Sequence, residues 1–305
     1  MLDPQGPGAE RIARLWWLML AISAVVFAVV VGFLIVALAR RRGDPDRSAA
    51  QPRWGDRLVI LGGVVIPSVI LISVFAVSLR DLGALAGASD PEALRVEVEG
   101  NLWWWEVRYP DTGAITANEI HIPSGEPVIL ELTTRDVIHS VWAPELQAKL
   151  DMIPGRTNSL TIEADEPGVY RGQCAEYCGL QHARMAFYVV AHERSDFDAW
   201  LRAETADRAD PATVAAREGE RIFLTSSCAG CHAVRGTAAD GDLGPDLTHL
   251  AARERLAAGT IPNDRPSLER WISDPQSVKP GAEMPESELT PSELEAVLAY
   301  LEGLE

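Results

Sequence analysis

Two long uncharged stretches stand out in the first third of the chain. One spans 25 residues from Leu15 to Ala39, and the other spans 22 residues from Leu58 to Leu79. A helix of about 20 apolar residues crosses a bilayer, so each stretch predicts a membrane-spanning helix. A signal peptide is the alternative for the first stretch. The apolar part of a signal peptide has only about 7–15 residues and precedes a small-residue cleavage site, which is not evident here.

Over residues 92–200 the pattern changes to short runs in which apolar and polar residues alternate. Turn sequences that contain proline and glycine, such as Glu166-Pro167-Gly168, separate these runs. The runs with strand character are Arg95–Glu99, Val128–Thr133, Ser159–Glu163 and Phe187–Ala191. Short strands at this spacing predict a β-sandwich or barrel.

The pattern becomes helical after the β region. Residues 201–216 lack a periodic apolar face and predict a linker or a weak helix. Three later segments have the spacing of short amphipathic helices: Glu218–Thr225, Leu268–Ser273 and Ser292–Leu301. The predicted organisation is therefore a membrane hairpin over 1–91, a β domain over 92–200, a linker over 201–216 and a helical domain over 217–305.

Charge adds an orientation to this organisation. The loop between the apolar stretches is rich in arginine: Arg40, Arg41, Arg42, Arg47, Arg53 and Arg57. Short basic loops stay in the cytoplasm, so both termini and everything after Leu79 are expected outside. Residues 1–57 carry a net charge of +3, whereas the whole chain carries −17, which leaves −20 for the rest. Such an acidic external part favours basic protein partners and excludes nucleic acid.

The first candidate for chemistry is the run Cys-Ala-Glu-Tyr-Cys-Gly-Leu-Gln-His-Ala-Arg-Met over 174–185. Two thiols, one imidazole and one thioether lie within twelve residues: Cys174, Cys178, His182 and Met185. Soft sulfur ligands combined with imidazole favour copper, whereas structural zinc sites rarely use methionine. A disulfide is the alternative for the two cysteines in an external compartment. His139 is the obvious second imidazole from elsewhere in the chain, although a lone histidine is more often structural.

These motifs resemble cytochrome c oxidase subunit II. The resemblance covers residues 15–200 and rests on the run above, Val137-Ile138-His139-Ser140, Trp103-Trp104-Trp105 and the two preceding apolar stretches. It implies a cupredoxin β-sandwich that holds a binuclear copper centre, CuA. It further implies that Cys174 and Cys178 bridge the coppers and that His139 and His182 each bind one. Met185 and the main-chain carbonyl of Glu176 are the implied weak ligands, and the Glu176 side chain is expected to reach toward a magnesium ion shared with subunit I.

Two further positions follow from this resemblance. The first aromatic residue of the tryptophan motif, Trp103, is the implied electron entry point, but Leu102 stands where the family usually has glutamine. At the mouth of a proton channel, many members of the family carry a glutamate at the position of Ile60. Asp56 is the nearest acid here, one turn earlier, so proton entry is expected to be built differently.

The second candidate for chemistry is Cys228-Ala-Gly-Cys231-His232, the attachment signature of c-type haem. Two thioether bonds and an axial histidine are expected from it. Met284 is favoured as the distal ligand because it is the only methionine after the motif, and His249 is the competitor. Residues 217–305 resemble class I cytochromes c, with Gly219, Phe223 and Tyr300 at the contact of the first and last helices and Gly244-Pro245-Asp246-Leu247 beside the axial histidine.

Together the resemblances imply the caa type of bacterial haem–copper oxidase. The expected role is to relay electrons from an external cytochrome c or membrane cytochrome complex through haem c and CuA to subunit I, where oxygen becomes water. No oxygen chemistry is expected on this chain. The expected location is the bacterial inner membrane, with the soluble domains on the periplasmic side and other oxidase subunits as partners.

Two alternatives remain at this point. A quinol-oxidase subunit II shares the architecture but lacks copper ligands, and the ligand set described above disfavours it. A stand-alone membrane-anchored electron carrier would use the same cofactors without an oxidase partner.

The sequence also predicts how the two soluble domains meet. Residues 58–204 carry a net charge of −11 and residues 205–305 carry −9, so the domains repel each other overall. We therefore expect docking through a small apolar patch near Trp103 rather than through charge pairing.

Overall fold

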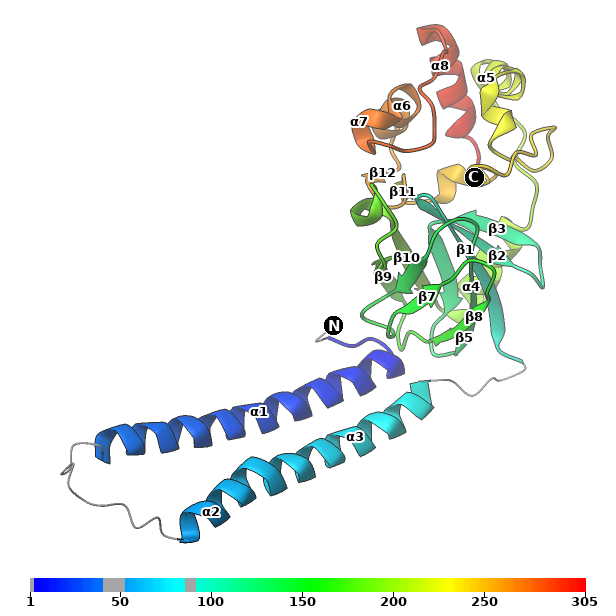
Figure 1. The fold of residues 1–305 in the computed structure, drawn as a ribbon. Helices are drawn as coiled ribbons and strands as arrows, with labels where there is room; N and C mark the ends of the chain where they lie inside the picture. Colours follow the sequence, from blue (N-terminus) through cyan, green and yellow to red (C-terminus); the bar gives the residue numbers. More distant parts are fainter. Residues whose placement is uncertain (1–2, 41–52, 86–91) are drawn as a thin grey trace. The chain divides into compact units, whose positions relative to one another are not determined.

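The computed structural model describes residues 3–40, 53–85 and 92–305, and for 53–54 and 83–85 only the backbone. Arg41, Arg42 and Arg47 of the predicted cytoplasmic loop lie outside the described residues, as do residues 86–91 of the predicted connector. The chain divides into two compact units. One comprises residues 10–88 and the other comprises residues 1–9 and 89–305. Figure 1 traces the order of the elements by colour along the chain.

The unit of residues 10–88 contains the two predicted membrane helices. Helix α1 spans Pro7–Arg40, and α2 (Arg53–Ile60), η1 (Leu61–Val65) and α3 (Ile66–Leu85) follow one another without a break. Both helices are long and apolar enough to cross a membrane. The middle segment η1 is a π-helical turn, in which the N–H of Ile66 bonds to the carbonyl of Leu61. This turn contains Gly62 and Gly63 and precedes Pro67, whose ring removes a donor and disturbs regular α-helical bonding.

The β domain is a sandwich of two five-stranded sheets. One sheet has the order β3-β2-β1-β5-β8 and the other has the order β4-β10-β9-β6-β7. The strands are β1 Leu94–Asn101, β2 Trp104–Tyr109, β3 Ala114–Ala117, β4 Glu119–Pro123, β5 Val128–Thr134, β6 His139–Trp142, β7 Leu150–Met152, β8 Asn158–Ile162, β9 Gly168–Cys174 and β10 Ala186–His192. All four predicted strands are present, and the cupredoxin-like sandwich is confirmed.

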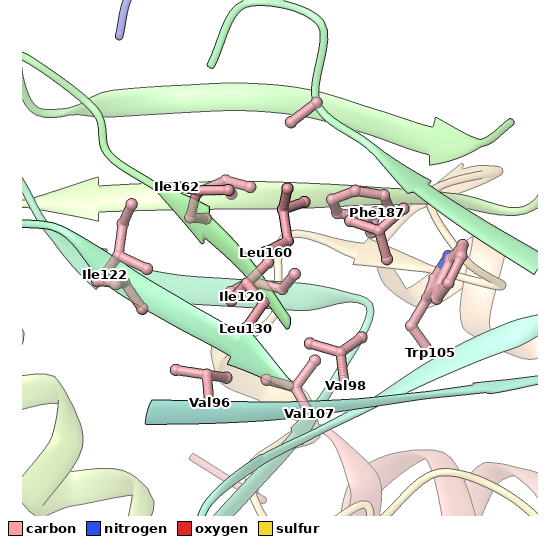
Figure 2. Packing of buried hydrophobic residues seen from close by; sticks show 14 of the residues in the cluster. Val96, Val98, Trp105, Val107, Ile120, Ile122, Leu130, Leu160, Ile162 and Phe187 are labelled. Atoms are coloured by element: carbon pink, nitrogen blue, oxygen red, sulfur yellow. The ribbon is translucent and has the colours of Figure 1, made fainter. Parts of the chain in front are cut away.

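One apolar core fills the space between the two sheets. Inward side chains alternate along each strand, as Val96 and Val98 on β1 and Leu130 and Leu132 on β5 show by their complete burial. Figure 2 shows Val96, Val98 and Leu130 together with Trp105 and Phe187 in this core. Rings of Trp105 and Phe187 pack edge to face at 5.3 Å. This packing supports the end of the sandwich where the sulfur-rich run begins.

The region between the two soluble domains differs from the prediction. Helix α4 spans Arg194–Glu204, which covers the end of the predicted β domain and the start of the predicted linker. It forms because Phe197 enters the sandwich core and Trp200 and Leu201, three and four positions later, pack against that core from the same helix face. Helix α5 then begins at Val214, so the non-helical connection is limited to residues 205–213.

The C-terminal region is mainly helical, as predicted. Its elements are α5 (Val214–Thr225), η3 (Ser227–Gly230), η4 (Leu250–Ala252), β11 (Arg255–Leu256), β12 (Ile261–Pro262), α6 (Arg265–Ser273), α7 (Pro275–Val278) and α8 (Pro291–Leu301). Thr290 and Glu293 form a capping box at the start of α8. Helices α5 and α8 cross at Gly219, and the rings of Phe223 and Tyr300 pack 5.7 Å apart. The predicted contact between first and last helices is therefore present.

Residues 5–9, just before and at the start of α1, belong to the same unit as the sandwich. The N–H of Gln5 donates to the carbonyl of Glu145, and the Gln5 carbonyl accepts from the N–H of Asp165. Ala9 donates to the carbonyl of Leu146 at 3.0 Å. A side chain at Gly6 would meet the carbonyl oxygen of Glu163 at 2.2 Å, so only glycine fits this close backbone approach.

The sandwich and the helical domain meet near Trp103, where the sequence analysis expected them to meet. The expected apolar patch was an incomplete account, because hydrogen bonds to main-chain carbonyls also join the domains here. Lys279 donates to the carbonyl of Trp103 and Arg184 donates to the carbonyl of Val278. Buried carbonyl oxygens need donors, and these long polar side chains supply them. Arg135 of the sandwich and Asp242 of the helical domain add an ion pair at 3.7 Å, which the sequence analysis did not expect.

Candidate metal and haem sites

The cysteine-rich run joins two neighbouring strands of one sheet. Cys174 ends β9, and Ala186, directly after Met185, begins β10. The loop is closed by a bond from the N–H of Cys174 to the carbonyl of Met185 at 2.9 Å. His139 begins β6, which pairs with β9 in the same sheet. Three adjacent strands therefore hold the loop from both ends, which limits its rearrangement.

The sulfur and nitrogen atoms of this loop converge, as predicted from their spacing. Around Cys174, the Sγ atom lies 3.8 Å from His139 Nδ1 and 3.2 Å from the Glu176 carbonyl oxygen. Around Cys178, the Sγ atom lies 3.6 Å from His182 Nδ1 and 3.8 Å from Met185 Sδ. Each thiol thus has one imidazole and one weaker donor beside it.

The two thiols themselves are 3.7 Å apart and are not joined in a disulfide. A disulfide requires a separation of about 2.05 Å, so this geometry favours a metal site over a cross-link. Ligand atoms of His139, Cys174 and Cys178 lie within 4.8 Å of one another, and among the described residues they form the only such group of histidine, cysteine and acidic side chains. The donors are soft, which suits copper.

Electrostatics prepares the thiols for metal binding. A hydrogen bond from Cys178 lowers the pKa of the Cys174 thiol to about 3, while burial opposes this change. The same hydrogen bond, reinforced by burial, raises the pKa of Cys178. The pair therefore keeps one proton between its two sulfurs at neutral pH. A metal ion that binds both thiolates displaces that proton.

Asp136 orients His139, a role that the sequence analysis did not assign. Its Oδ1 atom accepts a hydrogen bond from His139 Nε2 at 2.8 Å, which leaves Nδ1 directed toward Cys174. Burial lowers the pKa of His139, but the bonds to Asp136 and Cys174 outweigh it and raise the pKa overall. The other Asp136 oxygen accepts the N–H of Leu102 at 2.8 Å. Asp136 therefore also holds the segment that leads into Trp103.

The side chain of Glu176, which the family resemblance directs toward a magnesium ion shared with subunit I, takes part in a surface ion pair. Its carboxylate pairs with Lys149 at 2.9 Å, and the same ammonium binds Asp151 at 3.1 Å. The two side chains of this pair are 44% and 43% exposed, so the pair leaves the magnesium expectation untested.

The three tryptophans divide as strand geometry requires. Trp105 is completely buried, and its ring lies 5.9 Å from the His139 ring. Trp104 is half-buried on the other face of β2. Trp103 is also half-buried, and its indole N–H donates to the carbonyl of Cys178 at 2.9 Å. The predicted electron entry residue is thus bonded directly to a candidate copper ligand.

The Cys228–His232 motif lies after α5, on and just beyond the short helix η3. His232 Nδ1 donates to the carbonyl of Pro245 at 2.7 Å, which leaves Nε2 free to bind iron. A side chain at Gly244 would meet the His232 ring at 2.5 Å, so the predicted Gly-Pro loop does pack on this histidine. Burial lowers the pKa of His232, which favours the neutral form that binds metal.

The structure supports Met284 over His249 as the distal ligand. Met284 and Cys228 both pack against the same apolar core of the helical domain. His249 instead has Nδ1 2.8 Å from the carbonyl of Glu305 and Nε2 3.1 Å from the carbonyl of Ala206. Both of its ring nitrogens therefore face main-chain carbonyls, and one of them can donate a hydrogen bond there.

Replacing Met284 with alanine is expected to lower the haem reduction potential strongly. A methionine ligand raises the potential, and axial ligands set haem potentials over a range of about 0.8 V. Redox titration of the haem band measures the change. His249→Ala is the matched variant and should leave the potential close to that of the parent chain. A large shift with His249→Ala and none with Met284→Ala would reverse the assignment.

Comparisons with known proteins agree with this division into two sites. The family "Cytochrome C oxidase subunit II, periplasmic domain" matches residues 114–192, and the family "Cytochrome c" matches residues 216–305. These two domains imply copper and haem c.

Two relatives are similar over most of the length of this chain. A protein named cytochrome c oxidase subunit 2 from Alkalihalophilus pseudofirmus is 37% identical over 310 residues, covering 99% of this chain and 90% of the relative. A protein of the same name from Bacillus sp. strain PS3 is 34% identical over 285 residues, covering 87% and 79%. The crystal structure of the periplasmic domain of a cytochrome oxidase subunit II (CoxB) from Bradyrhizobium japonicum is 28% identical, covers 39% of this chain and 96% of that chain, and has a TM-score of 0.37.

Proposed function

The chain belongs to the cytochrome c oxidase subunit II family and carries a fused cytochrome c domain, and from this premise we propose that it relays electrons to a haem–copper subunit I. The observation that carries the proposal is the convergence of soft donors on two unbonded thiols 3.7 Å apart. Each thiol is flanked by protein donors, so the site favours electron transfer over substrate binding. The stand-alone carrier is the alternative that the functional test below separates.

For the copper centre, we assign Cys174 and Cys178 as bridging ligands of a binuclear CuA site. His139 and His182 each bind one copper, while Met185 and the Glu176 carbonyl are weak ligands. For the haem, Cys228 and Cys231 form the thioether bonds and His232 and Met284 bind the iron. When bound, both groups take up and release single electrons. The chain's residues hold them in fixed geometry, and oxygen reduction belongs to subunit I.

A magnesium ion at Glu176 would require ligands from the subunit I interface and release of the carboxylate from Lys149. Release from Lys149 should cost little, because the pair is solvent-exposed and Lys149 keeps Asp151 as a partner.

The orientation that the basic loop implies has support from residues 5–9. Because these residues bond to the sandwich, the start of α1 lies on the same side of the membrane as the sandwich. Two spanning helices return the chain to that side, which agrees with arginines on the cytoplasmic side. We therefore propose that the termini and both soluble domains face the periplasm or the cell exterior.

Protease added to the outer face of the cell membrane is expected to cleave within residues 209–213. These residues connect α4 and α5 and are largely exposed, which suits cleavage. Mass spectrometry of the fragments locates the cut. Protection from outside combined with cleavage from the cytoplasmic face would invert the proposed orientation.

The functional test is purification in mild detergent after expression in a host that makes the oxidase. We expect a second subunit with haem and copper to co-purify, and reduced cytochrome c to be oxidised with uptake of oxygen. Recovery of this chain alone, with copper and haem bound but without an oxidase partner, would instead support the stand-alone electron carrier.

A further inference from the structure

The loop that carries the copper ligands is bonded directly to the loop that carries Met284. From the copper side, Gln181 Nε2 donates to the carbonyl of Pro280, and Arg184 donates to the carbonyl of Val278 at 2.8 Å. From the haem side, Lys279 Nζ donates to the carbonyl of Trp103 at 2.6 Å. These three side chains are here called the junction latch. Two of them belong to the sandwich domain and one belongs to the helical domain.

Lys279 is the member of the latch whose burial is most unusual for its residue type. It is one of only two lysines in the chain, and its side chain is 3% exposed. Within the described residues it forms no ion pair. Its Nζ bonds to the carbonyl oxygens of Trp103 and Ala257, the second at 3.3 Å. Burial lowers the pKa of Lys279 to about 7. Burying an ammonium group without a carboxylate partner costs free energy, so we expect this position to serve a function.

The bonds of Lys279 continue to the copper ligands. The Trp103 carbonyl accepts from Lys279, and the Trp103 indole N–H donates to the carbonyl of Cys178 at 2.9 Å. Lys279 itself lies five positions before Met284 in the same loop. A continuous set of covalent and hydrogen bonds therefore joins the proposed haem ligand to a proposed copper ligand through one residue of each domain.

The surroundings of Lys279 leave little freedom at this junction. A Cβ atom at Gly281 would lie 3.0 Å from Cδ1 and 3.7 Å from Cβ of Leu180, and one at Gly259 would lie 2.9 Å from the Tyr188 ring. The N–H of Ala186, directly after Met185, donates to the carbonyl of Ala258 in the helical domain. The two domains thus approach at backbone distance on both sides of Lys279.

We propose that Lys279 is a positioning residue, which holds the Met284 loop on Trp103 and so sets the rate of electron transfer between the two cofactors. The inference rests on the proposed function. The step it serves moves one electron, so the iron site is oxidised and the copper site is reduced, with no bond made or broken. The rate of electron transfer falls steeply with the separation of the two cofactors, so loss of a buried contact that holds the two loops together should slow it.

The test uses the full chain with both cofactors and the variant Lys279→Met, which removes the ammonium but keeps the length of the side chain. We expect electron transfer from haem to copper, followed after flash reduction, to slow at least 10-fold. Reduction of the haem by an external donor should be unchanged, as should both cofactor spectra and both midpoint potentials. Amide exchange at Ala186 should become faster, because its acceptor lies across the junction. Arg221→Met is the matched control, because it removes an exposed cation of the same domain.

A cross-link supplies the second measurement. The Cβ separation of 3.7 Å between Leu180 and a residue at position 281 falls within the disulfide range of about 3.5–4.5 Å. Adding L180C and G281C to Lys279→Met should restore most of the transfer rate, since the disulfide takes over the positioning. The cross-linked variant also gives a result if Lys279→Met alone folds poorly, because the disulfide then holds the two domains together. The backbone at position 281 has φ of +86°, so the cross-linked chain will be somewhat strained.

The outcomes separate this inference from the proposed function. A parental rate in Lys279→Met with Ala186 still protected would overturn the role of Lys279 and leave the proposed function intact. A slow rate that persists in the oxidised, cross-linked chain would also overturn positioning. A parent chain that binds both cofactors but transfers no electron between them would contradict the proposed function itself.

Discussion

Replacing Cys174 with serine is expected to abolish the copper centre while the haem stays attached. The sulfur of Cys174 is buried and has contacts with three other proposed ligands: His139, Glu176 and Cys178. A serine hydroxyl is a hard donor that remains protonated at neutral pH, so it cannot replace a bridging thiolate. Copper content should fall from about two per chain toward zero, and the spin-resonance signal shared between two coppers should disappear.

The reciprocal variant provides the control for this experiment. Cys231→Ala should weaken or remove the covalent haem, which normally stays on the chain in a denaturing gel, but it should leave the copper signal intact. Each variant should therefore lose one cofactor and keep the other. Zinc in place of copper, or a Cys174–Cys178 disulfide in the purified parent chain, would show that the site has been misassigned.

Replacing Gly219 with alanine is expected to prevent the haem domain from folding stably. The added Cβ would lie 1.9 Å from the carbonyl oxygen of Ala296 and 2.9 Å from the Cβ of Tyr300. Both neighbours belong to α8, and backbone cannot move aside as a flexible side chain could. Overpacking typically costs about 1–3 kcal/mol and occasionally more. The gain in helix propensity, at most about 1 kcal/mol, is too small to compensate.

Thermal unfolding followed at the haem band measures this effect, together with the fraction of chain that carries haem. Gly303→Ala is the matched control, because the nearest atom to its added Cβ is 3.4 Å away and its φ is not in the left-handed region. We expect the control to keep haem and melt close to the parent chain. Equal behaviour of the two variants would mean that α5 and α8 do not pack as closely as the structure shows.

The parts of this protein that could be predicted from sequence are those in which the information is local. The membrane helices follow from uncharged stretches of sufficient length. Cys174, Cys178, His182 and Met185 lie in one short run, so their spacing alone brings them together at the end of β9. The motif from Cys228 to His232 is local in the same way, and the family resemblance supplied the distant partner His139.

The parts that could not be predicted depend on contacts between distant segments. Helix α4 was missed because the boundary predicted at residue 200 divides its apolar face, which Phe197, Trp200 and Leu201 form against the sandwich. The expected docking chemistry was incomplete because net charge says nothing about main-chain carbonyls, which Lys279 and Arg184 satisfy at the junction. Asp136 offered a signal that went unused: a carboxylate three residues before a ligand histidine, which is a frequent partner of metal-bound imidazole.

The contacts of residues 5–9 constrain the order of events during biosynthesis. Gln5 bonds to main-chain groups of Glu145 and Asp165, which a ribosome makes only after both apolar helices. Synthesis proceeds at about 5–20 residues per second, so the first residues emerge many seconds before their partners exist. In the proposed orientation these residues are exported first, and they can form their contacts only after the sandwich has folded. A bulky fusion placed directly ahead of Gln5 should therefore hinder maturation of the sandwich.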